Sequence, residues 1–188
     1  MMDKLIINKD NLKIDDINEF IDKVRVILTD DNNSILIVNY GNVIMFPGGN
    51  VDLSKESIMD GLIRELYEET GILYLEENLS YIMCLEHYQK NYPKRNGTSS
   101  NRLVRNYYYT AKYKGISEKL QKLTCNERKD NFQLSLVPID KLSELVKNNK
   151  NSNPRNPYFQ EELLSVLSIY DIPTIKPEES LVKKYIKI

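Results

Sequence analysis

The strongest constraint on how this chain folds is a pair of strands that leads directly into a helix. Segments 34–41 and 42–49 are rich in β-branched and apolar residues, which is typical of strands, and Gly41 lies in the tight turn between them. The second strand ends in the pair Gly48–Gly49, and a helix is predicted over 55–70. Strands that run into a helix favour a sheet with helices packed against it.

The predicted helix has one apolar face. Ser54 is expected to cap its N-terminus and Gly71 to end it, because glycine is common just past the end of a helix. At about 100° per residue, the apolar side chains form a single stripe. The stripe consists of Ile58, Met59, Leu62, Ile63 and Leu66. We therefore expect this face of the helix to pack on the sheet.

The remaining segments predict a mixed α/β fold in one domain. Strands are expected over 23–30, 77–89, 102–115 and 131–140, helices over 141–149 and 160–171, a short helix over 14–22 and a polar loop over 90–101. Because strands and helices do not alternate strictly, the expected sheet is mixed. The whole chain, 1–188, is expected to form a single domain with a core at about 22–172 and an extension at each end.

Three glutamates lie beside the apolar stripe of the predicted helix. Glu65 and Glu69 are four residues apart and Glu68 is three residues beyond Glu65, so the three carboxylates converge on one side. Arg64 is the only basic residue in 58–72. The glutamates are either solvated charges on a surface helix or ligands of a cation. Clustered carboxylate oxygens are the ligands that Mg²⁺ and Mn²⁺ prefer, which favours the second interpretation.

The Gly48–Gly49 pair indicates a ligand close to the backbone. Glycine lets the main chain approach a ligand and leaves a carbonyl free to coordinate it. The N-terminus of the predicted helix, nearby in sequence, presents unpaired N–H groups that favour phosphate. A metal, a carboxylate base and a phosphate site in one place suit the attack of water on a phosphoanhydride.

These residues resemble the Nudix box, a pattern written G-x5-E-x7-R-E-U-x-E-E-x-G-U, in which U is a bulky aliphatic residue. The residues that match its second half are Arg64, Glu65, Leu66, Glu68, Glu69, Gly71 and Ile72. Glu56 matches the earlier glutamate. The chain departs from the pattern at the start, where six residues separate Gly49 from Glu56 and Lys55 stands where a glycine is usual.

The resemblance implies an α/β/α sandwich around a mixed sheet. It also implies Mg²⁺-dependent hydrolysis of a nucleoside diphosphate linked to another group, with Mn²⁺ as an alternative cofactor. In that case Glu65, Glu68 and Glu69 would be catalytic metal ligands, Gly49 would be a ligand through its backbone carbonyl, and Arg64 would orient the carboxylates.

The position of the general base is left open by the resemblance. In parts of the family the base is one of the box glutamates, and in others it comes from a later loop. The candidates in a later loop of this chain are Glu127 and Asp130.

Basic and aromatic residues after the box are candidates for substrate binding. Lys94 lies in the predicted loop and Arg105 in the strand that follows it. Either Tyr88 or Tyr92 could serve as the tyrosine that dinucleoside polyphosphate hydrolases of the family tend to show. His87 is the only histidine and could also touch the substrate. Ordinary surface or core roles remain open for each of these residues.

Composition narrows the class of partner. The formal net charge of −1 argues against an extended surface for nucleic acid, and no apolar run is long enough to span a membrane. Two cysteines, Cys84 and Cys125, are too few for a disulfide framework, and the N-terminus is unlike a signal peptide. We expect a cytoplasmic protein that binds a small nucleotide-like diphosphate, and a homodimer stays open.

A second hypothesis is a catalytically silent Nudix-like domain that senses a nucleotide. Silent relatives are expected to lose glutamates from the box, whereas this chain keeps Glu65, Glu68 and Glu69. The retained acids favour the hydrolase.

Overall fold

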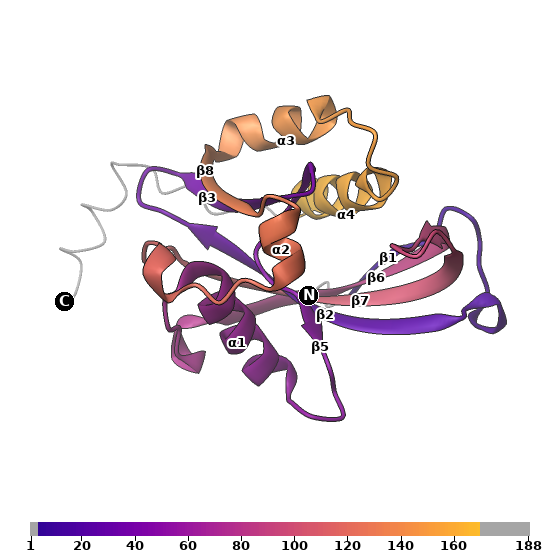
Figure 1. Ribbon diagram of the computed structural model, residues 1–188, viewed down its shortest axis with the longest axis horizontal. Coiled ribbons are helices and arrows are strands. Elements are labelled where there is room, and N and C mark those ends of the chain that lie inside the picture. The colour runs from indigo at the N-terminus through magenta and orange to yellow at the C-terminus, as the bar shows by residue number, and fades with distance from the viewer. Residues whose placement is uncertain (1–3, 170–188) are drawn as a thin grey trace, which may run out of the picture.

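The computed structural model describes residues 4–169, in which strands form one mixed sheet with helices on both faces (Figure 1). The strands are β1 (Lys4–Ile7), β2 (Glu19–Thr29), β3 (Ser34–Tyr40), β4 (Val43–Met45), β5 (Asn50–Val51), β6 (Ser80–Pro93), β7 (Ser99–Lys112) and β8 (Gln133–Pro138). The α-helices are α1 (Ile58–Thr70), α2 (Cys125–Lys129), α3 (Ile139–Asn148) and α4 (Asn156–Ile169). Short 3-10 helices are η1 (Ile14–Asp16), η2 (Glu76–Asn78) and η3 (Glu118–Leu120).

The sheet combines parallel and antiparallel neighbours. Its strand order is β1-β6-β7-β2-β3-β4, with β5 paired to β2 and β8 paired to β3. The pairs β1–β6 and β2–β7 are parallel, and the other pairs are antiparallel. The predicted mixed sheet is therefore confirmed.

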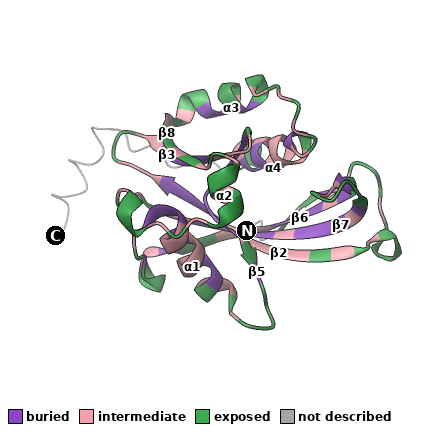
Figure 2. Cartoon of the chain, in the orientation of Figure 1, coloured by how far each residue is buried: buried purple, intermediate pink, exposed green. Residues whose placement is uncertain are grey.

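Each face of the sheet carries its own apolar core, as the alternation of side chains along strands requires. In β2, Val24 and Val26 face the core under α1, while Ile27 joins the core under α3 and α4. In Figure 1, α1 lies on one side of the sheet and α3 and α4 on the other. Figure 2 shows the buried residues concentrated in the central strands and on the inner sides of these helices. The predicted sandwich is confirmed.

Helix α1 begins later than predicted and ends where predicted. Its cap is Ser57, whose side chain accepts a hydrogen bond from Asp60 N at 3.1 Å, so the expectation of Ser54 as the cap is wrong. The Ser54 hydroxyl donates instead to the Asp52 carboxylate, and this local turn delays the helix. Gly71 ends the helix in the left-handed conformation, with φ of 71°.

The hairpin between β6 and β7 corrects the predicted loop over 90–101. Both strands continue into this segment, with Pro93 opposite Ser99, so that only the residues between them form the turn. The pairing shifts register after Gln89, where Asn91 has a φ of +51°. The segment was predicted to be a loop because its residues are polar. In the structure these polar residues stay in the ladder, and a bulge takes up the extra residue.

The N-terminal segment also differs from prediction. A short helix was predicted over 14–22, but only a 3-10 turn forms, and β2 already begins at Glu19 opposite Arg102 of β7. Strand β1 was not predicted, because its pairing with β6 is a long-range contact that the short polar segment does not reveal. Residues 170–172, at the end of the predicted last helix and core, lie outside the described residues.

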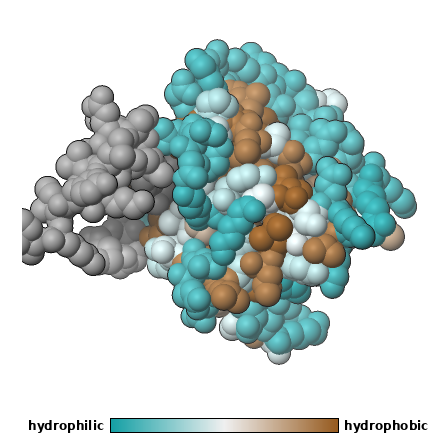
Figure 3. Space-filling model, turned by 90° about the vertical axis from the view of Figure 1, so that its left-hand side faces the viewer, coloured by the Kyte–Doolittle hydropathy of each residue, from teal (hydrophilic) through white to brown (hydrophobic). Residues whose placement is uncertain are grey.

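Two surface properties bear on partners. Among residues 4–169, no helix combines the length and apolar character needed to cross a membrane. One side of the molecule shows a band of hydrophobic residues between hydrophilic borders (Figure 3).

Candidate active site

A pocket of about 560 Å³ opens where the glycine pair, α1, the tip of the β6–β7 hairpin and α2 meet. Its acidic wall contains all three predicted metal-binding glutamates, together with Gly48, Gly49 and Arg64. The pocket is also lined by basic and aromatic residues, which include Lys23, Arg102, Tyr92 and Phe159. The pocket therefore joins the acidic residues of the box to a cationic region from other strands.

The glycine pair has no room for side chains. A Cβ at Gly48 would lie 2.2 Å from the carbonyl oxygen of Val24, and the φ of Gly48 is +129°. A Cβ at Gly49 would lie 2.4 Å from the carboxylate of Glu65. Glycine at both positions thus lets the chain pass between β2 and the acidic edge of α1.

The backbone of this segment is held by β2. The Gly49 carbonyl accepts a hydrogen bond from Val24 N at 3.0 Å, and the Gly48 carbonyl accepts one from the Arg25 side chain at 2.9 Å. The Gly48 N–H donates to Glu69 Oε2 at 2.8 Å. A carbonyl oxygen has a second lone pair, so Gly49 keeps coordinating capacity after its bond to Val24.

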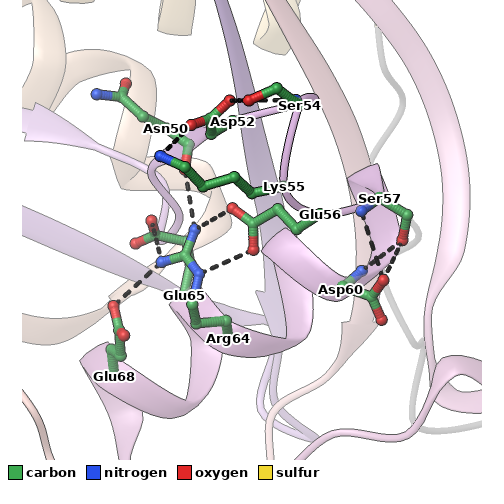
Figure 4. A network of polar contacts seen from close by, with 10 residues as sticks. All are labelled: Asn50, Asp52, Ser54, Lys55, Glu56, Ser57, Asp60, Arg64, Glu65 and Glu68. Carbon is green, nitrogen blue, oxygen red and sulfur yellow. Dashed lines mark hydrogen bonds and ion pairs between the residues drawn. The ribbon is translucent and has the colours of Figure 1, made fainter.

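Arg64 organises the acidic edge of the pocket (Figure 4). Its guanidinium forms a two-pronged pair with Glu56, at 3.0 and 2.7 Å. The remaining nitrogen, Nη1, donates to Glu65 at 2.8 Å and to Glu68 at 3.2 Å. Nη2 of Arg64 also donates to the Asn50 carbonyl at 3.0 Å, which ties the helix to β5 directly after the glycine pair. Glu56 and Arg64 thus fix the positions of the other acids.

Two of the glutamates are held in surroundings that disfavour their charge. Burial raises the pKa of Glu69 well above its ordinary range, against the Gly48 N–H, which lowers it. Burial also raises the pKa of Glu65, while its contact with Arg64 opposes the shift. Acids that are buried with too little positive charge nearby fit a site that a cation completes.

The acids do not form a closed metal cage in this arrangement. Within residues 4–169, no group of three or more histidine, cysteine, aspartate or glutamate side chains is placed so that it could hold a metal ion. The physical reason is Arg64, which draws Glu65 and Glu68 to its own guanidinium. The chemistry of the donors fits a hard divalent cation, but Glu65 and Glu68 would have to turn from Arg64 to bind one.

Both candidate bases in the later segment border the pocket. Glu127 belongs to α2, where its carboxylate accepts a hydrogen bond from Thr124 N at 2.6 Å. Asp130 follows the helix and forms an ion pair with Arg95 of the hairpin tip at 2.5 Å. Arg95 also donates to the Tyr40 hydroxyl, so the hairpin tip is tied to two segments on the other side of the pocket.

The structure brings one of the three predicted substrate-binding residues to this pocket. Lys94 lines it and forms an ion pair with Glu19. Arg105 and Tyr88 are not among its lining residues, and Arg105 pairs with Asp22 at 2.9 Å instead. Arg102 and Arg105 are three positions apart on β7, so their side chains lie on opposite faces of the sheet. Arg102 lines the pocket, and Arg105 does not.

Two basic residues that line the pocket, Lys23 and Arg25 of β2, were not singled out from the sequence. Arg102 of β7, from the basic segment around the hairpin, lines the pocket with them. Arg25 is 2% exposed and lies 3.6 Å from Glu162 of α4. Two basic residues at a spacing of two, inside a strand that is otherwise β-branched, were the available signal. Such residues point to the same face of a sheet, here toward the pocket.

The fold and the acidic helix edge define the class of protein. A family model described as NUDIX domain matches residues 20–160, and the chain belongs to the Nudix family. Members of this family are typically pyrophosphohydrolases that use divalent metal ions.

Several solved structures resemble this chain. A MutT protein from Methanosarcina mazei Go1 has a TM-score of 0.50 at 16% identity, with 81% of this chain and 97% of that chain covered. A MutT structure described for Aliivibrio salmonicida and Vibrio cholerae has a TM-score of 0.47 at 18% identity, covering 80% and 98%. The NUDIX domain of Shewanella oneidensis NrtR, complexed with ADP ribose, has a TM-score of 0.47 at 14% identity, covering 84% and 94%. No curated protein matches the chain.

Proposed function

We propose that this protein is a pyrophosphohydrolase that requires a divalent metal and cleaves a nucleoside diphosphate linked to another group. The observation that carries the proposal is the acidic edge of α1, where Glu65, Glu68 and Glu69 face one pocket beside the glycine pair. Membership of the Nudix family supports it.

Each residue of the site has a proposed role. Glu65, Glu68 and Glu69, together with the Gly49 carbonyl, would hold Mg²⁺ or Mn²⁺. When bound, the metal would polarise the phosphoryl oxygens of the substrate and offset the charge that develops on them. Arg64 holds Glu65 and Glu68 by hydrogen bonds in the metal-free arrangement, and its proposed role is to orient these carboxylates as they turn toward the metal.

Proton transfer is assigned to a carboxylate that borders the pocket. The base takes a proton from the attacking water as the phosphorus–oxygen bond forms, and a nucleoside monophosphate leaves. The candidates are the box glutamates, Glu127 and Asp130, and single substitutions of each to the amide would identify the base by the loss of turnover.

The cytoplasm is the proposed location, supported by two cysteines that are both free. A homodimer remains a prediction.

A test of the proposal is a hydrolysis screen with a panel of nucleoside diphosphates linked to different groups. We expect turnover with Mg²⁺ or Mn²⁺ and none in EDTA, because the proposed site consists of carboxylate oxygens. Undiminished turnover in excess chelator, with no metal found by elemental analysis, would refute the metal-dependent mechanism. Saturable nucleotide binding without turnover at any metal concentration would support the silent sensing domain instead.

A further inference from the structure

Two basic residues that line the pocket, Lys23 and Arg102, form no ion pair with an acidic residue of the described chain. Lys23 belongs to β2, and its Nζ lies 5.8 Å from the centre of the Phe159 ring. Arg102 of β7 is 8% exposed, and its guanidinium carbon lies 3.1 Å from the centre of the Tyr92 ring. Both side chains border the same space as the acidic helix edge.

The surroundings of Lys23 disfavour its charge. Burial, and then the positive charges of Arg25 and Arg102, lower the pKa of Lys23 to about 7, although the side chain still reaches the pocket. Glu162 and Glu65 oppose this shift only in part. Like charges that face one shielded space are costly unless an anion joins them.

Asn106 of β7 lies opposite Lys23 in the β2–β7 register. Asn106 is fully buried, and neither atom of its side-chain amide has a hydrogen-bond partner within the described part of the chain. Buried amides are normally paired, so Asn106 keeps unused polar capacity next to the strand position of Lys23, although it does not itself line the pocket.

A chain of buried hydrogen bonds holds Arg102 in position from behind. Arg102 Nε donates to Gln89 Oε1 at 2.5 Å, which leaves the amide nitrogen of Gln89 to donate to His87 Nδ1 at 2.9 Å. His87 Nε2 then donates to Glu161 at 3.2 Å, and Lys9 pairs with the same carboxylate at 2.5 Å. Because Nδ1 must accept, the ring proton of His87 is placed on Nε2.

This order of donors has a consequence for the pocket. Gln89 cannot rotate its amide without losing the bonds to both Arg102 and His87. Gln89 engages only Nε of Arg102, whose guanidinium also packs on Tyr92 at the pocket. A guanidinium binds phosphate oxygens through its terminal nitrogens, which Gln89 does not occupy.

We propose that Lys23 and Arg102 form an anion-binding site in the pocket that takes a phosphate group of the substrate, and that Gln89 and His87 are positioning residues for Arg102. Only the claim that the bound phosphate belongs to a substrate rests on the proposed function. The shared chemistry is a phosphate group, which can come from a polyphosphate chain or from the group linked to the diphosphate.

The site can be tested without metal or turnover. Inorganic tripolyphosphate is titrated by calorimetry into the full chain, in buffer freed of metal by a chelating resin. We expect binding to the wild type, and binding weaker by at least about tenfold in Lys23→Gln and in Arg102→Gln, the effect of one hydrogen bond to a charged group. Lys112→Gln is the control, because Lys112 pairs with Asp31 outside the pocket. Wild-type affinity in Lys23→Gln would overturn the site.

The positioning role has its own test, a double-mutant cycle between Gln89 and Arg102. We expect Gln89→Met to weaken tripolyphosphate binding in the wild type and to change nothing further in the Arg102→Gln background. Equal losses in both backgrounds would show that Gln89 acts only on general stability. If Gln89→Met does not fold, Arg102→Lys tests the same point, since lysine keeps the charge but lacks the Nε bond to Gln89; wild-type affinity would reject positioning.

Turnover then separates this inference from the proposed function. For substrates that differ by one phosphate, on the polyphosphate chain or on the linked group, Lys23→Gln should raise KM only for the more phosphorylated member. The pair that responds identifies the source of the phosphate. Unchanged KM for all pairs, with intact wild-type turnover, rejects the anion site and keeps the hydrolase. Tripolyphosphate binding that depends on Lys23, in a wild type without turnover, keeps the site and rejects the hydrolase.

Discussion

At the scale of single residues, Glu69 shows that burying a charged carboxylate in this site costs stability. Its side chain is almost fully buried and is held by the Gly48 N–H, yet burial and the nearby Glu65 raise its pKa. A carboxyl group with a raised folded pKa destabilises the fold at pH above that value. The penalty fades as pH falls through the raised pKa toward the ordinary one. At neutral pH, the metal-free protein therefore carries this penalty.

Replacing Glu69 by glutamine should remove the penalty and keep the contact, because the amide oxygen can still accept from Gly48. We expect Glu69→Gln to melt a few degrees higher than the wild type in EDTA at neutral pH, which corresponds to about 1 kcal/mol in a domain of this length. The same variant should lose nearly all turnover. Mg²⁺ should raise the melting temperature of the wild type much more than that of the variant.

The control for this experiment is the exposed Glu144→Gln on α3, which should leave both the melting temperature and the Mg²⁺ response unchanged. A Glu69→Gln protein that melts lower in EDTA and keeps the full Mg²⁺ response would mean that the glutamates do not share a metal.

Residues that are neighbours along one helix could be placed from the sequence. The spacing of Glu65, Glu68 and Glu69 was enough to predict that they share one side of α1, and the pocket contains all three. The contribution of Lys23 and Arg102 could not be predicted in the same way. That both line one pocket depends on the parallel pairing of β2 with β7, and no local pattern encodes the partner of a strand.

At the scale of elements, the end of α1 depends on Gly71. A Cβ at this position would lie 2.2 Å from the carbonyl oxygen of Ser117, and the backbone is left-handed. We expect Gly71→Ala to lower the free energy of unfolding by about 1–3 kcal/mol, measured by urea denaturation.

Gly97 provides a matched control, since it also has a positive φ, of 82°, but an added Cβ would meet nothing within 4 Å. Gly97→Ala carries only the cost of the backbone conformation, which is about 1 kcal/mol. If the two variants are equally stable, close packing against Ser117 is not what requires glycine at the end of the helix.

The hairpin tip is a second element with a separable role. Lys94 pairs with Glu19, and Arg95 reaches Asp130 and Tyr40 across the pocket. Exposed pairs of this kind contribute about 0.2–1 kcal/mol each to folding, so their loss should change stability little.

We expect Lys94→Ala combined with Arg95→Ala to raise KM by about tenfold or change the preferred substrate, with a smaller effect on kcat. Steady-state kinetics on the substrate panel would measure this, with Lys112→Ala as the control outside the pocket. A uniform loss of kcat at constant KM would argue against a role in substrate binding.

Helices and strands were predicted well where a local sequence signal was strong. They were predicted poorly where pairing with a distant strand determines the structure. The stop of α1 follows from Gly71 alone, and its apolar stripe packs as expected, with Leu62 and Leu66 fully buried. The segment 90–101 was misread, since its polar residues stay in strands only because β6 and β7 pair with each other.

At the scale of the whole molecule, the two faces of the sheet are linked through Arg25. Its guanidinium binds the carbonyls of Phe46 and Gly48 and lies 3.6 Å from Glu162 of α4. Glu162 also accepts a hydrogen bond from the Tyr108 hydroxyl at 2.7 Å. Helix α4 is thereby connected to the glycine pair that borders the acidic edge of α1.

Removal of the Glu162 carboxylate should lower the stability of the whole fold. Glu162→Leu leaves the charge of Arg25 buried and unpaired, which is expected to destabilise the protein by about 3–5 kcal/mol in chemical denaturation. Glu144→Leu on the exposed side of α3 is the matched control and should change stability by less than about 0.5 kcal/mol. A loss of similar size in both variants would show that Arg25 does not need this partner.

The order of the sheet also governs how the chain can fold as it leaves the ribosome. Strand β2 is inside the sheet, but its parallel neighbour β7 comes much later, with Glu19 opposite Arg102. At synthesis rates of about 5–20 residues per second, the partner of β2 arrives only after roughly 4–16 seconds. During that interval one long, β-branched edge has no permanent neighbour and is open to pairing with other nascent chains. The same pairing that brings Lys23 to Arg102 therefore makes early release of the chain, or crowding of polysomes, a hazard for its assembly.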